Sequence, residues 1–182
     1  MPASSFKPVL YVCGIIAGTD TLVEQGKETL RSYFGEISAE SPRVSFDYTD
    51  YYTREMGGPL YRRFIAFERL GEAENLAEAK IRSIRMEEEL RLKNGADARV
   101  VNLDPGFMTA AALFMATTKD FAHRVPLRDG IYSHLELMFG KNDVRYLEWT
   151  YPDFKTGAYD AFFLDLRQSF LKRWKLLKCP GL

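Results

Sequence analysis

The feature that most constrains this fold is the apolar run at residues 8–17, PVLYVCGIIA. A membrane span needs about 18 apolar residues, so this run is too short to be one. An almost uninterrupted apolar and β-branched run predicts a strand that is buried on both faces. We therefore expect this segment to form a strand inside the domain.

The pattern after this run alternates between helical and strand periods. Asp20 follows a Gly-Thr pair that predicts a turn and a helix N-cap, and Gly35 is expected at the C-cap of that helix. Strands are then expected at 42–49 and 60–70, a long helix at 72–93 and a strand at 98–103. This β-α-β-β-α-β order predicts the split βαβ core of ferredoxin-like folds.

The second half of the chain extends this core. We expect a turn at 104–106, a short Ala- and Met-rich helix at 108–117, strands near 123–127, 130–139 and 144–150, and a C-terminal helix at 159–178. No repeat, low-complexity stretch or linker divides the 182 residues. The sequence therefore predicts a single α+β domain over residues 1–182.

The composition sets bounds on the class of protein. The chain holds 25 basic and 25 acidic residues, and 46% of its residues are hydrophobic. This balance gives no general attraction to nucleic acid or to an anionic membrane. Cys13 and Cys179 belong to no CxxC pair, which argues against a disulfide framework or a zinc site. With no signal or membrane-spanning pattern, the expected location is the cytoplasm.

The first candidate site segment is YTDYYTREMG at 48–57, directly after Asp47. Carboxylates and hydroxyls that converge at a strand end could hold a hard cation such as Mg²⁺, with Asp47 as a ligand. Glu55 could transfer protons, and Tyr52 could contact a ligand. Alternatively, the acidic and hydroxyl groups serve only local backbone hydrogen bonds in a turn.

The second segment is NLDPG at 102–106, where a predicted strand ends. Ligands often lie at the carboxyl ends of strands, so Asn102 is a candidate ligand-binding residue. Asp104 could coordinate a metal or act as a base. Its carboxylate could equally cap the Asp-Pro-Gly turn.

The third segment, TTKDFAHR at 117–124, is the best candidate for anion binding. Arg124 could form paired hydrogen bonds with a phosphate or carboxylate, and Lys119 adds a point charge. His123 could act as a general acid or base near neutral pH. A solvated charged turn would explain the same residues, and His134 is interpreted as an ordinary packed side chain.

Three further residues complete the candidate set. Trp149, in the segment WTYPDF at 149–154, could form a flat wall for a planar ligand or could close the core. Lys80 lies between apolar residues on one face of the long predicted helix, and Arg63 lies in the strand expected at 60–70. Each could bind an anion in a polar pocket, extend past the apolar surface to water or form a structural salt bridge.

Several motifs with a known mechanism are absent. The chain has no GxxxxGK[ST] phosphate loop, no GxGxxG, no GxSxG, no HExxH and no EF-hand loop. Aromatic and basic residues do not interleave as an RNA-binding sheet requires. The basic C-terminal helix, with Lys172, Arg173, Lys175 and Lys178, suits the helix dipole as well as nucleic acid, which is therefore ranked last as a partner.

The same segments resemble a bacterial and archaeal family of unknown function, DUF4416, whose members often carry the label "GTP-binding protein". The resemblance covers nearly the whole chain through YTDYYTREMG, RFIAFERL, VNLDPGF, ATTKDFAHRVPL, GIY and WTYPDF. It implies a small standalone domain and no known reaction. The label receives no support from the residues, because Gly140-Lys141-Asn142-Asp143 does not have the order NKxD of a guanine-reading motif.

We therefore expect a small enzyme or ligand-binding domain that acts on a phosphorylated or carboxylated small molecule. In this hypothesis Arg63, Lys80, Lys119 and Arg124 bind the anion, while Asp47, Glu55 and Asp104 bind Mg²⁺ or transfer protons. His123 assists as acid or base. The alternative is a non-catalytic interaction module or a homodimer, whose contact surface would be the tyrosine-rich loop and the segment at 149–154.

Overall fold

The computed structural model describes residues 6–48 and 50–178. Thr49 and Cys179, which the sequence interpretation included, lie outside the described residues. The chain mixes helices with one antiparallel sheet, which confirms the expected α+β class. No helix among the described residues is both long and apolar enough to cross a membrane.

The structure contains nine strands and four α-helices within the described residues. The strands are β1 (Val9–Ala17), β2 (Ile37–Glu40), β3 (Val44–Ser45), β4 (Tyr61–Gly71), β5 (Val101–Met108), β6 (Ala112–Thr117), β7 (Val125–Arg128), β8 (Ile131–Phe139) and β9 (Val144–Tyr146). The α-helices are α1 (Asp20–Phe34), α2 (Asp50–Met56), α3 (Leu76–Lys93) and α4 (Asp160–Lys178). Two short 3₁₀ helices, Ala73–Asn75 and Phe154–Thr156, precede α3 and α4.

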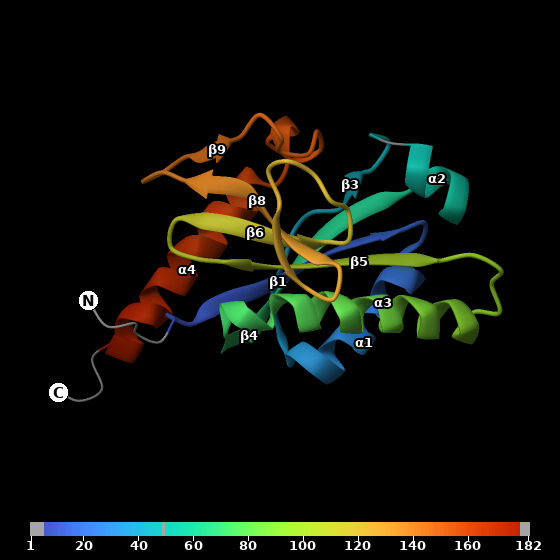
Figure 1. The fold of residues 1–182 in the computed structure, drawn as a ribbon, viewed down its shortest axis with the longest axis horizontal. Coiled ribbons are helices and arrows are strands. Elements are labelled where there is room, and N and C mark those ends of the chain that lie inside the picture. The colour runs from blue at the N-terminus through green and yellow to red at the C-terminus, as the bar shows by residue number, and fades with distance from the viewer. Residues whose placement is uncertain (1–5, 49, 179–182) are drawn as a thin grey trace.

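All strands join one sheet in the order β2-β4-β1-β5-β6-β8-β7. The short strands β3 and β9 pair with β4 and β8, and each printed pairing is antiparallel. In Figure 1, α1 and α3 lie together below the strands, while α4 runs along the left of the view. The prediction that the first strand is buried on both faces is confirmed, because every residue of β1 is buried and β1 lies between β4 and β5.

The two faces of β1 pack against different helices. Cys13 and Ile15 point toward α1 and α3 and join a core that includes Leu30 of α1. Val12 belongs to the core on the opposite face, which is closed by Phe163 and other aromatic residues of α4. Because side chains alternate along a strand, one apolar run supplies both cores.

The sheet divides between β5 and β6. The two strands pair only at Gly106, Phe107 and Met108, so the first part of β5 has no strand partner on that side. Two side chains of α3 replace the missing strand at Leu103. Lys80 donates to the Leu103 carbonyl oxygen at 2.8 Å, and the Leu103 N–H donates to Glu87 at 2.7 Å. The N–H and carbonyl groups of Leu103 are therefore paired, although no strand lies beside them.

The sequence interpretation of the segment 104–117 was wrong in two respects. The predicted turn at 104–106 is the middle of β5, and the predicted helix at 108–117 is the end of β5 and then β6. Pro105 is accommodated because its nitrogen lies on the edge of β5 that has no strand partner. Burial in the sheet outweighs the helical propensity of the alanines and methionines, since β6 packs between β5 and β8.

Other predicted elements are confirmed with shifted boundaries. The predicted strand at 42–49 shrinks to the two residues of β3, and the four-residue strand β2, which the sequence analysis did not predict, also pairs with β4. The N-cap at Thr19 accepts a hydrogen bond from the Leu22 N–H, and Gly35 is the C-cap of α1. The segment between β3 and β4 contains the short helix α2.

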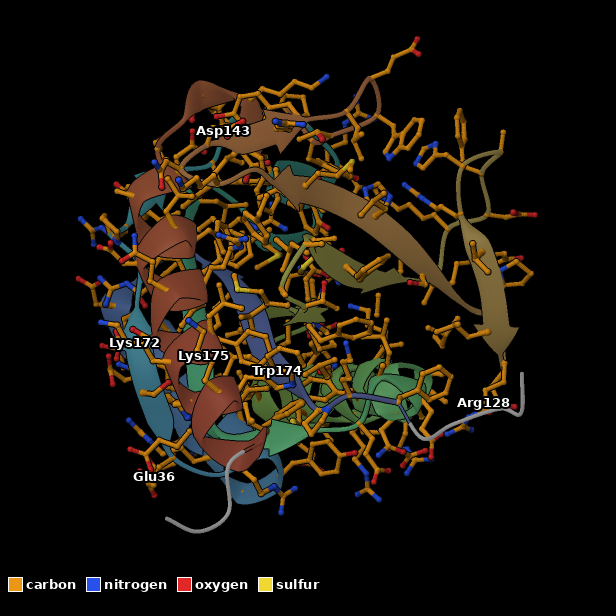
Figure 2. All side chains as sticks on the ribbon, turned by 90° about the vertical axis from the view of Figure 1, so that its left-hand side faces the viewer. Glu36, Arg128, Asp143, Lys172, Trp174 and Lys175 are labelled. Carbon is orange, nitrogen blue, oxygen red and sulfur yellow. The ribbon has the colours of Figure 1, made fainter. Side chains whose placement is uncertain are left out.

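The C-terminal helix places its aromatic and basic residues on different sides. Figure 2 labels Lys172, Trp174 and Lys175 on α4, and Lys172 and Lys175 are exposed. Trp174 is half-buried with the ammonium group of Lys7 4.9 Å from its ring centre. The side chain of Lys178, which the sequence interpretation grouped with these cations, lies outside the described residues.

We predict that Gly106→Ala destabilises the domain by about 1–3 kcal/mol, because an added methyl would overpack the point where β5 and β6 meet. An ideal Cβ at Gly106 would lie 2.4 Å from the Phe114 carbonyl oxygen. Gly18→Ala is the matched control, since its Cβ would meet no atom closer than 3.4 Å. Urea denaturation measures both, and equal stability of the two variants would contradict the prediction.

Candidate functional site

A cavity of about 230 Å³ lies where β5 and β6 separate. Strands β4, β5, β6 and β8, helices α2 and α3, and the segments 117–124 and 151–154 all contribute to its walls. Its charged lining consists of five basic and three acidic residues, namely Arg62, Lys80, Arg99, Lys119, Arg124, Glu87, Asp104 and Glu136. Segments that are far apart in the sequence therefore bring their charges to one place.

Asp104, Lys80 and Arg62 form the floor of the cavity, and Asp104 is paired with both cations. One carboxylate oxygen accepts a hydrogen bond from Lys80 at 3.1 Å, and the other accepts from Arg62 at 3.0 Å and from Asn102 at 2.7 Å. Burial alone would raise the pKa of Asp104, but the adjacent Lys80 and Arg62 outweigh it and hold the pKa below its ordinary value. The carboxylate is therefore ionised at neutral pH and anchors two cations.

Arg62 connects this floor to the C-terminal half of the chain. Its guanidinium donates to Asp153 at 2.8 Å as well as to Asp104, and both Arg62 and Asp153 are buried. The guanidinium also lies over the ring of Phe64 at 5.1 Å and near the ring of Phe154 at 5.5 Å. Two acids and aromatic neighbours hold this side chain in one position.

Arg99 and Glu87 close the side of the cavity next to α3. Arg99 donates to Asn102 at 2.7 Å and pairs with Glu55 at 2.5 Å and with Glu87 at 3.3 Å. Burial raises the pKa of Glu87, although the charge of Lys80 and the hydrogen bond from the Leu103 N–H oppose that effect. Arg99 and Lys80 therefore already have acidic partners within the protein.

Lys119 and Arg124 form the opposite wall and differ from the floor in their pairing. Neither side chain forms an ion pair with an acid among the described residues. Arg124 donates to the Lys119 carbonyl oxygen at 2.7 Å, and the Lys119 ammonium lies 4.4 Å from the centre of the Tyr51 ring. The Arg124 Nε is buried without a hydrogen-bond partner in the described structure. The cavity's surplus positive charge is therefore on this wall.

Two histidines and a glutamate follow one another at the edge of the cavity. Glu136 and His134, both on β8, are buried, and their Oε2 and Nε2 atoms lie 2.7 Å apart. The other His134 nitrogen, Nδ1, lies 3.2 Å from Nε2 of His123. The ring of His123 stacks on Trp149 with a centre distance of 4.9 Å.

The structure brings most of the sequence-predicted residues to this place. Six of them line the cavity, namely Tyr52, Lys80, Asn102, Asp104, Lys119 and Arg124. His123 and Trp149 lie next to it, through His134. Glu55 reaches the network through its ion pair with Arg99.

Arg63 and Asp47 lie away from the cavity. Arg63 points to the other face of β4, where it pairs with Glu40 at 3.0 Å, and its neighbour Arg62 lines the cavity instead. One residue along a strand reverses the face, so the sequence could not distinguish these two arginines without the register. Asp47 is exposed, and no group of three or more His, Cys, Asp or Glu side chains in the described chain could hold a metal ion.

Sequence reasoning missed several residues of the site, namely Arg62, Arg99, His134, Glu136 and Asp153. One signal was present in β8, where His134 and Glu136 alternate with apolar residues and therefore share a face. Asp153 lies in the quoted segment at 149–154, but only the fold shows that it faces Arg62.

Comparison with known proteins gives one result. The family model "Domain of unknown function (DUF4416)" matches residues 7–170. The protein is therefore an α+β domain with a charged cavity, and it belongs to the DUF4416 family. Among curated proteins and among solved structures, no significant match was found.

We predict that Asp104→Asn flattens the acid limb of the stability curve. Because the folded-state pKa of Asp104 is below its ordinary value of 3.8, its contribution is present above that pH and is lost as the pH falls further. One proton changes the slope by at most about 1.4 kcal/mol per pH unit. Urea denaturation between neutral pH and strong acid measures this slope. Asp47→Asn, at an exposed acid outside the cavity, is the control, and identical slopes for both variants would contradict the prediction.

Proposed function

We propose that the cavity binds the phosphate or carboxylate group of a small molecule. The observation that carries this proposal is the wall formed by Lys119 and Arg124, which face the cavity without an acidic partner among the described residues. Arg124 is half-buried, and a cation in that position is costly without a partner, so an anionic ligand would remove that cost. Lys119 is exposed and would add a point charge. The wall is therefore where the anionic group would bind.

The remaining charges support this location. Asp104 is shared by Lys80 and Arg62, and Arg99 is paired with Glu55 and Glu87, so the cations of the floor are already neutralised. A ligand would gain least from the floor and most from the opposite wall. The floor would then supply a fixed polar surface with Asn102 and Asp104 as hydrogen-bonding groups.

The other lining residues suit the carbon part of a small molecule. Phe46, Tyr52, Tyr151 and Phe154 place aromatic surface next to the charged groups. Small-molecule sites combine mostly apolar walls with a few placed polar groups. The volume of about 230 Å³ fits a small metabolite better than a large one.

We infer that β1, α1, β2, β4, α3 and β5 correspond to the split βαβ unit expected from the sequence. The strand order β2-β4-β1-β5, with α1 and α3 packed against the same core, supports this correspondence to ferredoxin-like folds. In this view β6 to β9 and α4 are the extension that completes the cavity. Whether Mg²⁺ accompanies the ligand stays a prediction.

We predict that inorganic phosphate or succinate binds the protein and that Arg124→Gln weakens this binding about tenfold or more. A hydrogen bond to a charged group contributes roughly 1.5–3 kcal/mol, and about 1.4 kcal/mol corresponds to tenfold in affinity. Isothermal titration calorimetry and thermal shift measure the affinity, with Lys119→Gln as a second test.

The matched control for both variants is Lys141→Gln, at an exposed lysine outside the cavity. This variant should bind like the unchanged protein. If Arg124→Gln, Lys119→Gln and Lys141→Gln all bind with equal affinity, neither Lys119 nor Arg124 contributes to binding. Absence of binding by phosphate, succinate and a wider panel of phosphorylated and carboxylated metabolites would overturn the proposed function.

A second candidate function, self-association of two copies, is favoured by the exposed strand β7. This strand ends the sheet order, and its four residues are all exposed. Val125 is 62% exposed and Leu127 is 43% exposed, and the nearby Phe121 is 64% exposed. Figure 2 shows Arg128 at the end of this strand, at the margin of the molecule. Antiparallel pairing of β7 with its copy would satisfy the free edges of both strands.

We predict that, on this second view, the protein sediments as a dimer at micromolar concentration and that Val125→Lys shifts it toward the monomer. A charge on the edge strand opposes pairing with a like-charged copy. Lys141→Gln again serves as the control for a changed surface charge. A strict monomer at micromolar concentration would rule out this candidate and leave the anion-binding proposal untouched.

A further inference from the structure

Glu136, His134 and His123 form a row of three side chains that runs outward from the interior of the domain. Glu136 and His134 are 2% and 3% exposed, so the first two members are shielded from water. The contacts run from Glu136 Oε2 to His134 Nε2 at 2.7 Å and from His134 Nδ1 to His123 Nε2 at 3.2 Å. The row thus leads from two side chains that line the cavity to the half-buried His123, which lies at the cavity's edge next to Arg124 of the wall.

The carboxylate determines where the protons of both imidazole rings lie. The contact between Glu136 Oε2 and His134 Nε2 is close but does not have the angle of a hydrogen bond, so Nε2 counts as a buried atom without a hydrogen-bond partner. Two lone pairs 2.7 Å apart would repel each other, so the hydrogen of His134 belongs on Nε2, facing the carboxylate. In the neutral ring His134 Nδ1 is then an acceptor, and His123 Nε2 must carry the hydrogen that points at it. The remaining nitrogen of His123, Nδ1, is left with a free lone pair. It has no hydrogen-bond partner in the part of the chain that the structure describes.

Two aromatic neighbours hold the ring of His123 in this orientation. The Trp149 ring is nearly parallel to it, at 7°, and Phe121 lies 5.2 Å away on centre distance. Trp149 is itself fixed, since its indole N–H donates to the Leu135 carbonyl oxygen at 2.8 Å. A ring held by stacking and by one hydrogen bond presents its free nitrogen in a constant direction.

We propose that Glu136, His134 and His123 form a proton relay in which His123 is the general base for an O–H group. The O–H belongs to the bound anionic molecule or to a water beside it. His123 Nδ1 forms a bond to the proton, and the bond between that proton and oxygen breaks with its electron pair staying on the oxygen. His134 and Glu136 are positioning residues that stabilise the imidazolium. The inference rests on the proposed function, because the anion brings the O–H group to the rim.

The charges around His123 support a base at neutral pH. Burial lowers the pKa of His123, the facing His134 and Arg124 lower it further, and only Glu136 opposes them. The ring is therefore unprotonated near neutral pH and able to accept a proton. An anion bound at Arg124 would offset the repulsion from that guanidinium, so binding should raise the pKa of His123.

The first experiment determines the tautomers in the free protein, where the chain's two histidines give a simple spectrum. Two-bond ¹⁵N–¹H correlation spectra of the ¹⁵N-labelled protein distinguish protonated from unprotonated ring nitrogens. We expect both rings to carry their hydrogen on Nε2 at neutral pH. A hydrogen on His134 Nδ1 would overturn the relay whether or not any ligand is found.

Variants of the carboxylate provide the matched comparison. Glu136→Gln replaces the obligatory acceptor with an amide, which can also donate, so the preference of His134 for the Nε2 hydrogen should be lost. Glu148→Gln removes an exposed carboxylate close in sequence and should leave the spectrum unchanged. Unaltered tautomers in a folded Glu136→Gln protein, with the fold checked by its amide spectrum, would show that Glu136 does not control the relay.

The second experiment follows the pH titration of both rings with and without inorganic phosphate, while calorimetry measures binding separately. We expect saturating phosphate to raise the pKa of His123, and Arg124→Gln to abolish the rise. If phosphate binds by calorimetry and the pKa of His123 does not move, the relay is overturned and the anion site stands. If phosphate, succinate and the wider panel of phosphorylated and carboxylated metabolites all fail to bind, the proposed function fails, and the relay's link to a ligand fails with it.

Discussion

The replacement of a strand partner by two side chains of α3 is the interaction on which the site depends. Where β5 separates from β6, Lys80 donates to the Leu103 carbonyl oxygen and Glu87 accepts from the Leu103 N–H, on the edge of β5 that has no strand partner. Without them the edge of β5 would carry unpaired buried polar groups, which cost more than an ordinary hydrogen bond contributes. The sheet can therefore open inside the domain, and the opening becomes a cavity.

The same interaction determines the charge of that cavity. Lys80 also forms an ion pair with Asp104, and Asp104 forms a second ion pair with Arg62. The lysine at the edge of β5 is therefore part of a cluster of one acid and two cations. Buried charges are stable only when they are paired and hydrogen-bonded, and this cluster meets that requirement. The paired charges of the floor thus arise from this packing arrangement, while the wall of Lys119 and Arg124 adds positive charge that an anionic ligand would neutralise.

Many of the candidate residues could be found from the sequence because local features marked them. Lys119, His123 and Arg124 lie within six positions of one another, and Asn102 and Asp104 alternate toward the same face of a strand. The choice between Arg62 and Arg63 was beyond sequence reasoning, since it depends on the register of β4 against β1. The Asp-Pro-Gly segment has a local preference for a turn, but it continues as a strand because Pro105 lies on the edge of β5 that has no strand partner.

The sequence by itself determined the α+β class, the doubly buried first strand and the helices α1, α3 and α4, because hydrophobic period and caps act over a few residues. Only the tertiary structure decided that β5 and β6 separate, that Asp153 reaches Arg62, and that Glu136, His134 and His123 form one chain. These contacts join positions up to 91 residues apart, and their pairing follows from how strands and helices pack rather than from any neighbouring residue.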